Sequence, residues 1–516
     1  MYRRSFLAAG LAAILTVALG PVTAQTEYSL EKVQRWGIFE LSLKGPANDN
    51  CFVDVEFGAR FKHKDQTVAV TGFYDGEGSY RIRFMPNKEG LWNYVTSSNH
   101  GKLDNKTGKF ICVPASGGNH GPVKVYNKYH FAYADGTPYL PFGTTCYAWT
   151  HQSEKLQDQT LKTLREAPFN KLRMCVLPKY YPYNRKEPLY YPFEKDQHGK
   201  WDFSRFNCEF FRHLEKRVED LQRLGIEADL ILFHPYDRGH WGFDNMGQVN
   251  DNRYLRYVIA RLAAYRNVWW SMANEYDLVK TKTMDDWERL LDVVAGSDPY
   301  KRLCSVHNGG YDRIYDPNNP QISHASIQNW NLKNAKNWRL QFKKPVIVDE
   351  CEYEGDIEEV WGNISAEELV HRFWLGSVAG CYVGHGETYR HPEDIIWWSK
   401  GGVLRGKSAA RIAFLRQIMQ DGPPEGIEPI GYNWKWRRIS GGKNEDRYYL
   451  IYFGAHQPKR FSSWTVKVPS DHKYNIDIID TWNMKIRPLK KLFDNNFEIE
   501  LPGKPYMAVR IRRDAK

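Results

Sequence analysis

The chain has 516 residues, which is too many for a single hydrophobic core, so we expect two or three domains. Its formal charge of +11 comes from Lys and Arg residues that are scattered among acidic ones, rather than gathered in the cluster typical of nucleic-acid binding. The eight cysteines contain no CxxC pair and no other metal-type spacing. These features argue against a nucleic-acid-binding protein and against a cysteine-held metal.

Residues 1–24 have the parts of a secretory signal peptide: basic "MYRR", apolar "FLAAGLAAILTVALG", and "VTA" before Gln25. The apolar run is shorter than the ~20 residues that span a bilayer. We therefore predict cleavage after Ala24, export to the periplasm or the medium, and a mature chain of net charge +9. An uncleaved membrane anchor is the alternative, and no later segment is apolar enough to span a membrane.

Residues 25–120 have the pattern of a β-sandwich. "CFVDVEFGARF" and "QTVAVTGFY" alternate as half-buried strands do, and "DGEG" and "PNKEG" supply turns. Export would permit disulfides, and Cys51 with Cys112 is the favoured pair. The cysteines as a group are nevertheless more typical of free buried thiols, because most lie in or beside expected core strands.

Residues 121–423 alternate between helical and strand patterns. Apolar residues from Phe211 to Leu224 have helical spacing and are followed by Gly225, which favours a helix end. "ADLILF" then has the continuous apolar character of a strand covered on both faces. Another helix begins at a capping box formed by Ser365 and Glu368.

Eight strands are expected in this region, each followed by a helix or a long connection. Their sequences are "PYLPFGTTCYAW", "FNKLRMCVLPK", "ADLILFHPYD", "VWWSMANEYD", "LCSVHNGG", "ISHASIQNWN", "PVIVDECEYEG" and "CYVGHGETY". The pattern predicts an α/β fold, a (β/α)8 TIM barrel. The alternative is a doubly wound open sheet, which should carry a Gly-rich phosphate turn after its first strand, and none is present.

Residues 424–516 return to a β pattern after "DGPPEG". We expect strands at "RYYLIYF", "WTVKV", "YNIDIID", "FEIEL" and "YMAVRIR". The fold class is therefore a TIM barrel flanked by an N-terminal and a C-terminal β-sandwich.

Polar and aromatic side chains concentrate where the barrel strands end, which is where barrel active sites form. Glu275 ends the fourth strand and Glu350 ends the seventh, each directly after an apolar run. Glycoside cleavage needs two opposed carboxyl groups, one to protonate the leaving oxygen and one to attack the anomeric carbon or to activate a water. A separation of about 5–5.5 Å gives retention and ~6.5–9.5 Å gives inversion. The pair predicts a glycosidase, with inversion as the alternative to retention.

Long motifs resemble a known group of proteins. "FNKLRMCVLPKYYPYN", "GIEADLILFHPYD", "KPVIVDECEYEG" and "YVGHGETY" resemble exported bacterial proteins that combine a DUF5060 sandwich, a DUF4038-type barrel and a DUF5605 domain. "GFYDGEGSYRIRFMPNKEGLWNY" is similar to the DUF5060 sandwich. "Asn-Glu" after strand four, with a Glu closing strand seven, resembles the retaining glycoside hydrolases of clan GH-A. The resemblance covers nearly the whole mature chain and implies an architecture and a catalytic class, not one particular sugar.

The resemblance implies roles for individual residues. Glu275 would be the acid/base, Glu350 the nucleophile, and Asn274 the ligand of the sugar hydroxyl at C2. Arg173 would be the cation that lies near the nucleophile and keeps it ionised. Glu352 would point to the same side of an extended strand as Glu350, so it is the competing nucleophile.

Further candidate sugar ligands are His234, Tyr236, His307, Trp330, Glu387, Trp397 and Trp398. The two tryptophans lie in "IIWW", which fits a sugar platform or a packed helical turn equally well. No HExxH motif or histidine triplet is present, so we expect no metal and no cofactor. The sequence thus predicts an exported retaining glycoside hydrolase that acts on a poly- or oligosaccharide. The alternative is a non-catalytic glycan-binding protein on a glycosidase scaffold.

Overall fold

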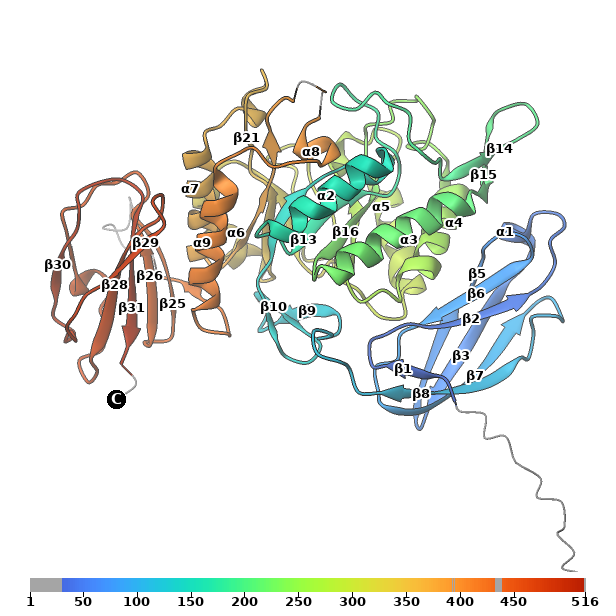
Figure 1. Cartoon of the computed structure of the whole chain (residues 1–516), viewed down its shortest axis with the longest axis horizontal. Helices are drawn as coiled ribbons and strands as arrows, with labels where there is room; N and C mark the ends of the chain where they lie inside the picture. Colours follow the sequence, from blue (N-terminus) through green and yellow to red (C-terminus); the bar gives the residue numbers. More distant parts are fainter. Residues whose placement is uncertain (1–29, 392, 394, 432–438, 515–516) are drawn as a thin grey trace, which may run out of the picture.

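The computed structural model describes residues 30–391, 393, 395–431 and 439–514, so the predicted signal peptide lies outside the described residues. Two β-rich domains lie on opposite sides of a central barrel (Figure 1). In the described part of the chain, no helix is both long enough and apolar enough to cross a membrane.

The N-terminal domain consists of two facing sheets. One has the strand order β1-β8-β7-β3-β4 and the other has the order β2-β6-β5. Their bounds are β1 Lys32–Gln34, β2 Phe39–Lys44, β3 Phe57–His63, β4 Gln66–Thr71, β5 Phe73–Tyr74, β6 Ser79–Phe84, β7 Gly90–Ser98 and β8 Thr107–Val113. Alternate residues of β3 are buried, as the period-2 pattern predicts.

The structure adds one unexpected element to this domain, the short helix α1 Cys51–Asp54. All eight cysteines are free, as the sequence favoured for the group, so Cys51 and Cys112 are not paired. The Cys51 thiol instead donates to the carbonyl oxygens of Pro46 and Asn48.

The barrel is one sheet of eight parallel strands in the order β18-β17-β16-β13-β12-β22-β20-β19. A parallel bridge between His307 and Ser326 joins its two edge strands and closes the barrel. The bounds are β12 Phe142–Thr145, β13 Lys171–Cys175, β16 Glu227–Phe233, β17 Val268–Ala273, β18 Cys304–Ser305, β19 Ala325–Gln328, β20 Val346–Glu350 and β22 Tyr382–His385. These are the eight predicted strands, so the predicted TIM barrel is confirmed.

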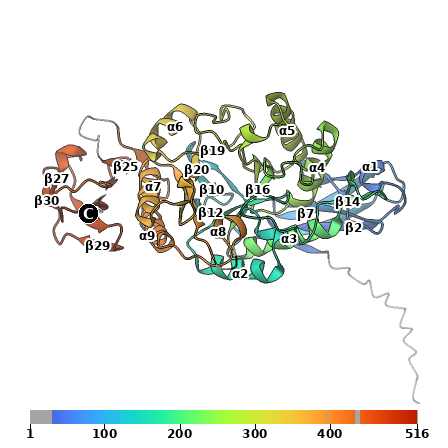
Figure 2. The same cartoon turned by 90° about the horizontal axis from the view of Figure 1, so that it is seen from above.

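Helices surround the strands (Figure 2). Their bounds are α2 Glu154–Glu166, α3 Cys208–Arg223, α4 Gln248–Leu262, α5 Met284–Ser297, α6 Ala335–Phe342, α7 Ala366–Val378, α8 Trp397–Lys400 and α9 Ser408–Gln420. Gly225 follows α3 with a φ of 71°, the left-handed geometry expected there. Ser365 caps α7 by accepting from the Glu368 amide, whereas the Glu368 carboxylate binds Arg372 rather than completing the capping box.

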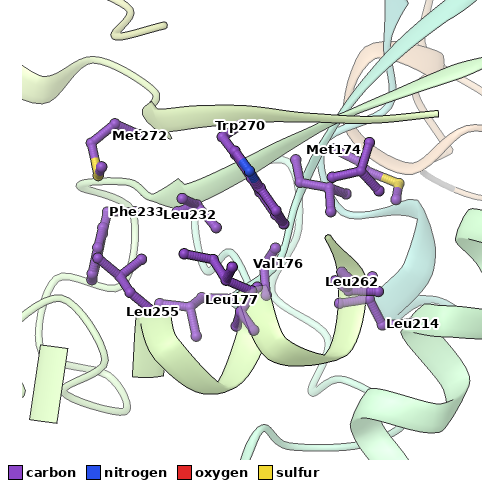
Figure 3. Close-up of a cluster of buried hydrophobic side chains, with 14 of the residues drawn as sticks. Met174, Val176, Leu177, Leu214, Leu232, Phe233, Leu255, Leu262, Trp270 and Met272 are labelled. Atoms are coloured by element: carbon purple, nitrogen blue, oxygen red, sulfur yellow. The ribbon is translucent and has the colours of Figure 1, made fainter. Parts of the chain in front are cut away.

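Apolar side chains fill the space between the strands and helices α3 and α4 (Figure 3). Trp270 of β17 is fully buried there with Met174, Leu232 and Met272 from the strands and Leu255 from α4. This close packing fixes the strands, and therefore the positions at which they end.

A small sheet closes the amino-terminal end of the barrel. It comprises β9 Val123–Tyr126, β10 His130–Tyr133 and β11 Pro138–Tyr139. Phe131 contacts the rings of Trp269 and Tyr382, which lie near the starts of their strands. The carboxyl ends of the strands therefore form the open end of the barrel.

The C-terminal domain has a six-stranded sheet, β24-β25-β26-β31-β28-β29, and a two-stranded sheet, β27-β30. The bounds are β24 Glu428–Pro429, β25 Ser440–Asn444, β26 Tyr448–Tyr452, β27 Arg460–Ser462, β28 Tyr474–Asp480, β29 Lys485–Pro488, β30 Glu498–Glu500 and β31 Met507–Arg513. The strand expected at "WTVKV" is absent, because Ser463–Thr465 form a 3-10 turn whose Ser463 carbonyl accepts from Val466 and Lys467.

Both β-rich domains contact the barrel through specific side chains. Arg83 of the N-terminal domain pairs with Glu215 of α3 at 2.7 Å, and Glu215 also pairs with Arg261 of α4. Tyr452 of the C-terminal domain stacks on Trp374 of α7 with a centroid distance of 5.2 Å. These contacts lie on the outside of the barrel, away from its open end.

Candidate active site

Glu275 and Glu350 line one cavity of about 240 Å³ at the carboxyl end of the barrel. Both side chains are buried. The other acidic residue in the wall is Glu352, and the aromatic residues are Tyr147, Tyr181, Tyr183, Tyr236, Tyr311, Trp330, Tyr353, Trp361 and Trp398. The cavity wall therefore combines charged side chains with aromatic rings, a composition that suits the polar edges and apolar faces of a sugar.

The backbone bends sharply at Glu275. This residue has φ 53° and ψ 55°, the left-handed region that costs a non-glycine residue about 1 kcal/mol or more. The bend ends strand β17 and starts the 3-10 turn Tyr276–Leu278. Asp277 fixes the bend, because its carboxylate accepts from the amides of Gly309 and Gly310 at 2.6 and 2.9 Å. The strained turn holds the Glu275 carboxyl group in the cavity wall.

Burial and the nearby charge of Glu350 raise the pKa of Glu275 to about 7. Lys179 and a hydrogen bond from the phenol of Tyr236 act in the opposite direction, because both favour the charged carboxylate. With a pKa of about 7, Glu275 is partly protonated at neutral pH.

Glu350 is contacted by a second phenol. Tyr147 donates to its carboxylate, and the Tyr147 hydroxyl also lies 3.2 Å from Oδ1 of Asn274. The Nε2 atom of His307 lies 3.9 Å from the same carboxylate. Burial holds the pKa of His307 well below its usual range, so the ring is neutral.

A buried ionic layer lies inside the barrel and supports Asn274. Lys171 and Arg173 both contact Asp229 and Asp349, with Lys171 Nζ at 2.5 and 2.8 Å from the two carboxylates. The second terminal nitrogen of Arg173 donates to Oδ1 of Asn274 at 3.0 Å. This bond fixes the amide, so its nitrogen is the group left for a ligand in the cavity.

The comparisons with known proteins agree with this geometry. Residues 126–436 match the catalytic domain of the Apiosidase-like family. The chain belongs to this family. Residues 32–99 match DUF5060 and residues 436–512 match DUF5605, as the sequence motifs predicted.

Solved structures extend the comparison. A candidate glycoside hydrolase from Bacteroides vulgatus ATCC 8482 is 41% identical, with a TM-score of 0.88, over 94% of this chain and 100% of that chain. A glycoside hydrolase family 5 structure from the same strain is 15% identical, with a TM-score of 0.59, over 77% of this chain and 95% of that chain, and shows a shared fold. No curated protein matches the chain. The Apiosidase-like protein is a glycoside hydrolase, which confirms the predicted enzyme class.

Six predicted site residues of this glycoside hydrolase line the cavity: Asn274, Glu275, Glu350, Tyr236, Trp330 and Trp398. The sequence analysis did not single out Tyr147, Tyr181, Tyr183, Tyr311, Tyr353 and Trp361 as site residues. Their positions in loops after the strands are a weak signal, because loop tyrosines and tryptophans also pack in cores. Lys179, the last residue of the expected strand "FNKLRMCVLPK", was not assigned a role either.

The predicted ligands His307, Trp397, Glu387 and His234 lie outside the cavity wall. His307 faces Glu350 at 3.9 Å without a hydrogen bond from either ring nitrogen, and the other three have partners of their own. Trp397 donates its indole N–H to Thr144 at 2.9 Å and packs in the core. Glu387 accepts from the amides of Arg405 and Gly406 and so holds that loop. His234 accepts from the Tyr236 amide and contacts the Leu177 carbonyl, so it positions the backbone of Tyr236.

Arg173 lies near enough to Glu350 for their charges to interact, as expected of a cation beside the nucleophile. Its hydrogen bonds and ion pairs go instead to two aspartates of the ionic layer and to Asn274, and none to Glu350 is seen among the described residues. Glu352 does not continue an extended strand, because β20 ends at Glu350 and Glu352 has a φ of 66°. Its carboxylate pairs with Arg372 of α7 at 2.8 Å. Across the described ranges, no group of three or more His, Cys, Asp or Glu side chains is arranged to hold a metal ion.

Proposed function

We propose that this glycoside hydrolase uses a retaining double displacement, with Glu350 as the nucleophile and Glu275 as the acid/base. One observation carries the proposal: the two side chains line the same cavity, and the pKa of Glu275 is raised to about 7 by burial and by Glu350. Two carboxyl groups in different environments can divide the roles of acid and nucleophile between them.

In the first step, a Glu350 oxygen attacks the anomeric carbon while the bond to the leaving oxygen breaks. Glu275 gives its proton to that oxygen, and a glycosyl ester of Glu350 forms. In the second step, the Glu275 carboxylate takes a proton from water, whose oxygen attacks the anomeric carbon and releases Glu350. Glu275 ends the cycle protonated, as it began.

The surrounding residues support this assignment. The amide nitrogen of Asn274 is available to bind the hydroxyl at C2 of the sugar, because its carbonyl oxygen is held by Arg173. Trp330 is 48% exposed at the edge of the cavity and offers a ring face to a neighbouring sugar. We further propose that the enzyme is exported, since residues 1–24 have the pattern of a signal peptide, and that it meets poly- or oligosaccharides outside the cytoplasm.

The test uses a panel of activated aryl glycosides. An aryl apioside is tried first, because the catalytic domain matches the Apiosidase-like family. Glu275→Ala should lose activity on poor leaving groups and regain it with azide on a good one, giving a glycosyl azide of the substrate's anomeric configuration. Glu350→Ala with azide should give the opposite anomer. For the wild type, proton NMR should show a first-formed product that retains configuration. An inverted first product, or a Glu275→Ala variant that stays fully active on poor leaving groups without azide, would overturn the proposal.

A further inference from the structure

Lys179 is a buried cation in the wall of the cavity. It is 1% exposed, and in the part of the chain that the structure describes it makes no ion pair. Its ammonium group instead lies over aromatic faces, 4.0 Å from the ring centroids of both Tyr147 and Tyr236 and 4.4 Å from that of Tyr181. Cation–π contacts can hold a desolvated ammonium group in place without neutralising its charge.

Two of these rings are the ones that contact the carboxyl pair. Tyr147 donates to Glu350, and Tyr236 donates to Glu275. A cation over the face of a phenol withdraws electron density from the ring and makes its O–H a stronger donor. One ammonium group therefore acts on both carboxyl groups in the same direction, by its own charge and through a phenol on each side.

The neighbouring cations are already neutralised. Lys171 and Arg173 are both shared between Asp229 and Asp349, so that layer carries balanced charges. Lys179, by contrast, has no ionic partner of its own among the described residues, so its charge is available to compensate Glu275 and Glu350.

We propose that Lys179 is a positioning residue that sets the charge state of the carboxyl pair, acting through Tyr147 and Tyr236. This inference rests on the proposed function, because it concerns the same two carboxyl groups. With Lys179 charged, the pair carries one proton and one negative charge over the working pH range, which is the state needed to start the first step.

The electrostatic surroundings of Lys179 are consistent with this role. Burial lowers the pKa of Lys179, while the Cys175 thiol, Glu275 and Glu350 act to raise it and Arg173 acts to lower it. The charge of Lys179 in turn contributes to the lowered pKa values of His234 and His307. The two histidines are neutral and so add no charge beside Lys179. The carboxylates that act on its pKa are Glu275 and Glu350.

The experiment compares Lys179→Met and Lys179→Gln, which remove the charge, with Lys179→Arg, which keeps it. The pH profile of kcat/KM is measured on a phenyl glycoside, whose poor leaving group needs protonation by Glu275 and so makes acid catalysis visible in the basic limb. The charge of Lys179 lowers the pKa of Glu275, so its loss should raise that pKa and move the basic limb to higher pH by about one unit in the neutral variants. Lys179→Arg should bring the basic limb back toward its wild-type position.

A purely structural role would lower kcat and leave the basic limb in place, and that result would overturn the inference. If the neutral variants do not fold, titration of carbon-13-labelled lysine by NMR replaces them. Glu350→Gln should lower the pKa of Lys179 relative to wild type, and an unchanged value would overturn the inference. Activity that survives in Glu275→Ala and Glu350→Ala would instead defeat the proposed function, so the two failures are distinguishable.

Discussion

Tyr236 donates the hydrogen bond of its phenol to the carboxyl group of Glu275, the residue whose pKa burial and Glu350 raise to about 7. The two influences oppose each other. Burial disfavours the charged carboxylate, whereas a donated hydrogen bond favours it. The balance places the pKa near neutrality, where an acid/base residue can both give and take a proton.

Tyr236→Phe should therefore move the basic limb of the pH profile of kcat/KM to higher pH. The wild-type limb is expected near pH 7, since activity falls as Glu275 loses its proton. Without the phenol the charged form is less stable, so the proton is held to higher pH, by roughly half a unit to one unit. Tyr183→Phe is the control, because Tyr183 lines the cavity but makes no hydrogen bond to Glu275 among the described residues. A limb that moves to lower pH would contradict the role of Tyr236.

Tyr147→Phe should affect the nucleophile instead. The variant removes the donor to Glu350 and leaves the ring under Lys179, so we expect kcat/KM to fall by roughly 10- to 100-fold, the range for a hydrogen bond to a charged group. Tyr181→Phe is the matched control, since its hydroxyl donates to Ser399 at 2.6 Å and not to Glu350. Equal losses in the two variants would show that general packing, rather than this bond, is responsible.

The positions of the carboxyl pair could be predicted from sequence for a simple reason. Strands of a barrel all end at the same rim, so residues directly after apolar runs, such as Glu275 and Glu350, must lie near one another. The rule does not extend beyond the strand ends. Two residues after β20, a left-handed backbone turns Glu352 toward Arg372. Beyond β22, the helical turn α8 decides that Trp398 rather than Trp397 lines the cavity.

The sequence pattern could not predict contacts between side chains and loops that are distant in the chain. Glu387 follows a strand as Glu275 does, but the loop at residues 405–406 returns over it and donates two amides. Lys179 and Tyr147 meet only because separate strand ends converge, and neither residue has a local pattern that distinguishes a cavity wall from a core. Sequence thus indicated which strands supply the site, while long-range contacts decide which side chains enter it.

Arg173→Met should destabilise the barrel strongly. After the substitution, Lys171 is the cation of the layer that remains for both Asp229 and Asp349. Removing one partner from a buried ionic group typically lowers the free energy of unfolding by about 3–5 kcal/mol. Arg223→Met is the control on the same barrel, because Arg223 is 61% exposed in its pair with Asp220 and should cost less than about 1 kcal/mol. Denaturant unfolding followed by fluorescence measures both. Similar values for the two variants would show that the ionic layer does not stabilise the fold.

Substitution of Trp330 should affect substrate binding, whereas substitution of Trp397 should affect the stability of the fold. Trp330→Ala removes an exposed ring at the cavity edge, so KM should rise by roughly 3- to 10-fold with little change in Tm. Trp397→Ala removes a buried ring bonded to Thr144, so the free energy of unfolding should fall by about 3–5 kcal/mol. Steady-state kinetics and thermal melts on both variants check this. A Trp330→Ala variant with unchanged KM would remove that residue from the binding surface.

The choice between Glu350 and Glu352 can be made with a matched pair of substitutions. Glu350→Gln should lower kcat by at least about 10³-fold, because an amide cannot form the glycosyl ester. Glu352→Gln should lower it by less than about tenfold, because Arg372 keeps Glu368 as an ionic partner at 2.8 Å and the cavity keeps both proposed catalytic groups.

A trapped intermediate identifies the residue directly. A 2-deoxy-2-fluoro glycoside with a good leaving group should accumulate as an ester, since the fluorine slows the second step more than the activated first step. Fragmentation of the labelled peptide by mass spectrometry should place the sugar on Glu350. A label on Glu352 would require its side chain to leave Arg372 and reach the anomeric carbon, and it would transfer the role of nucleophile to that residue.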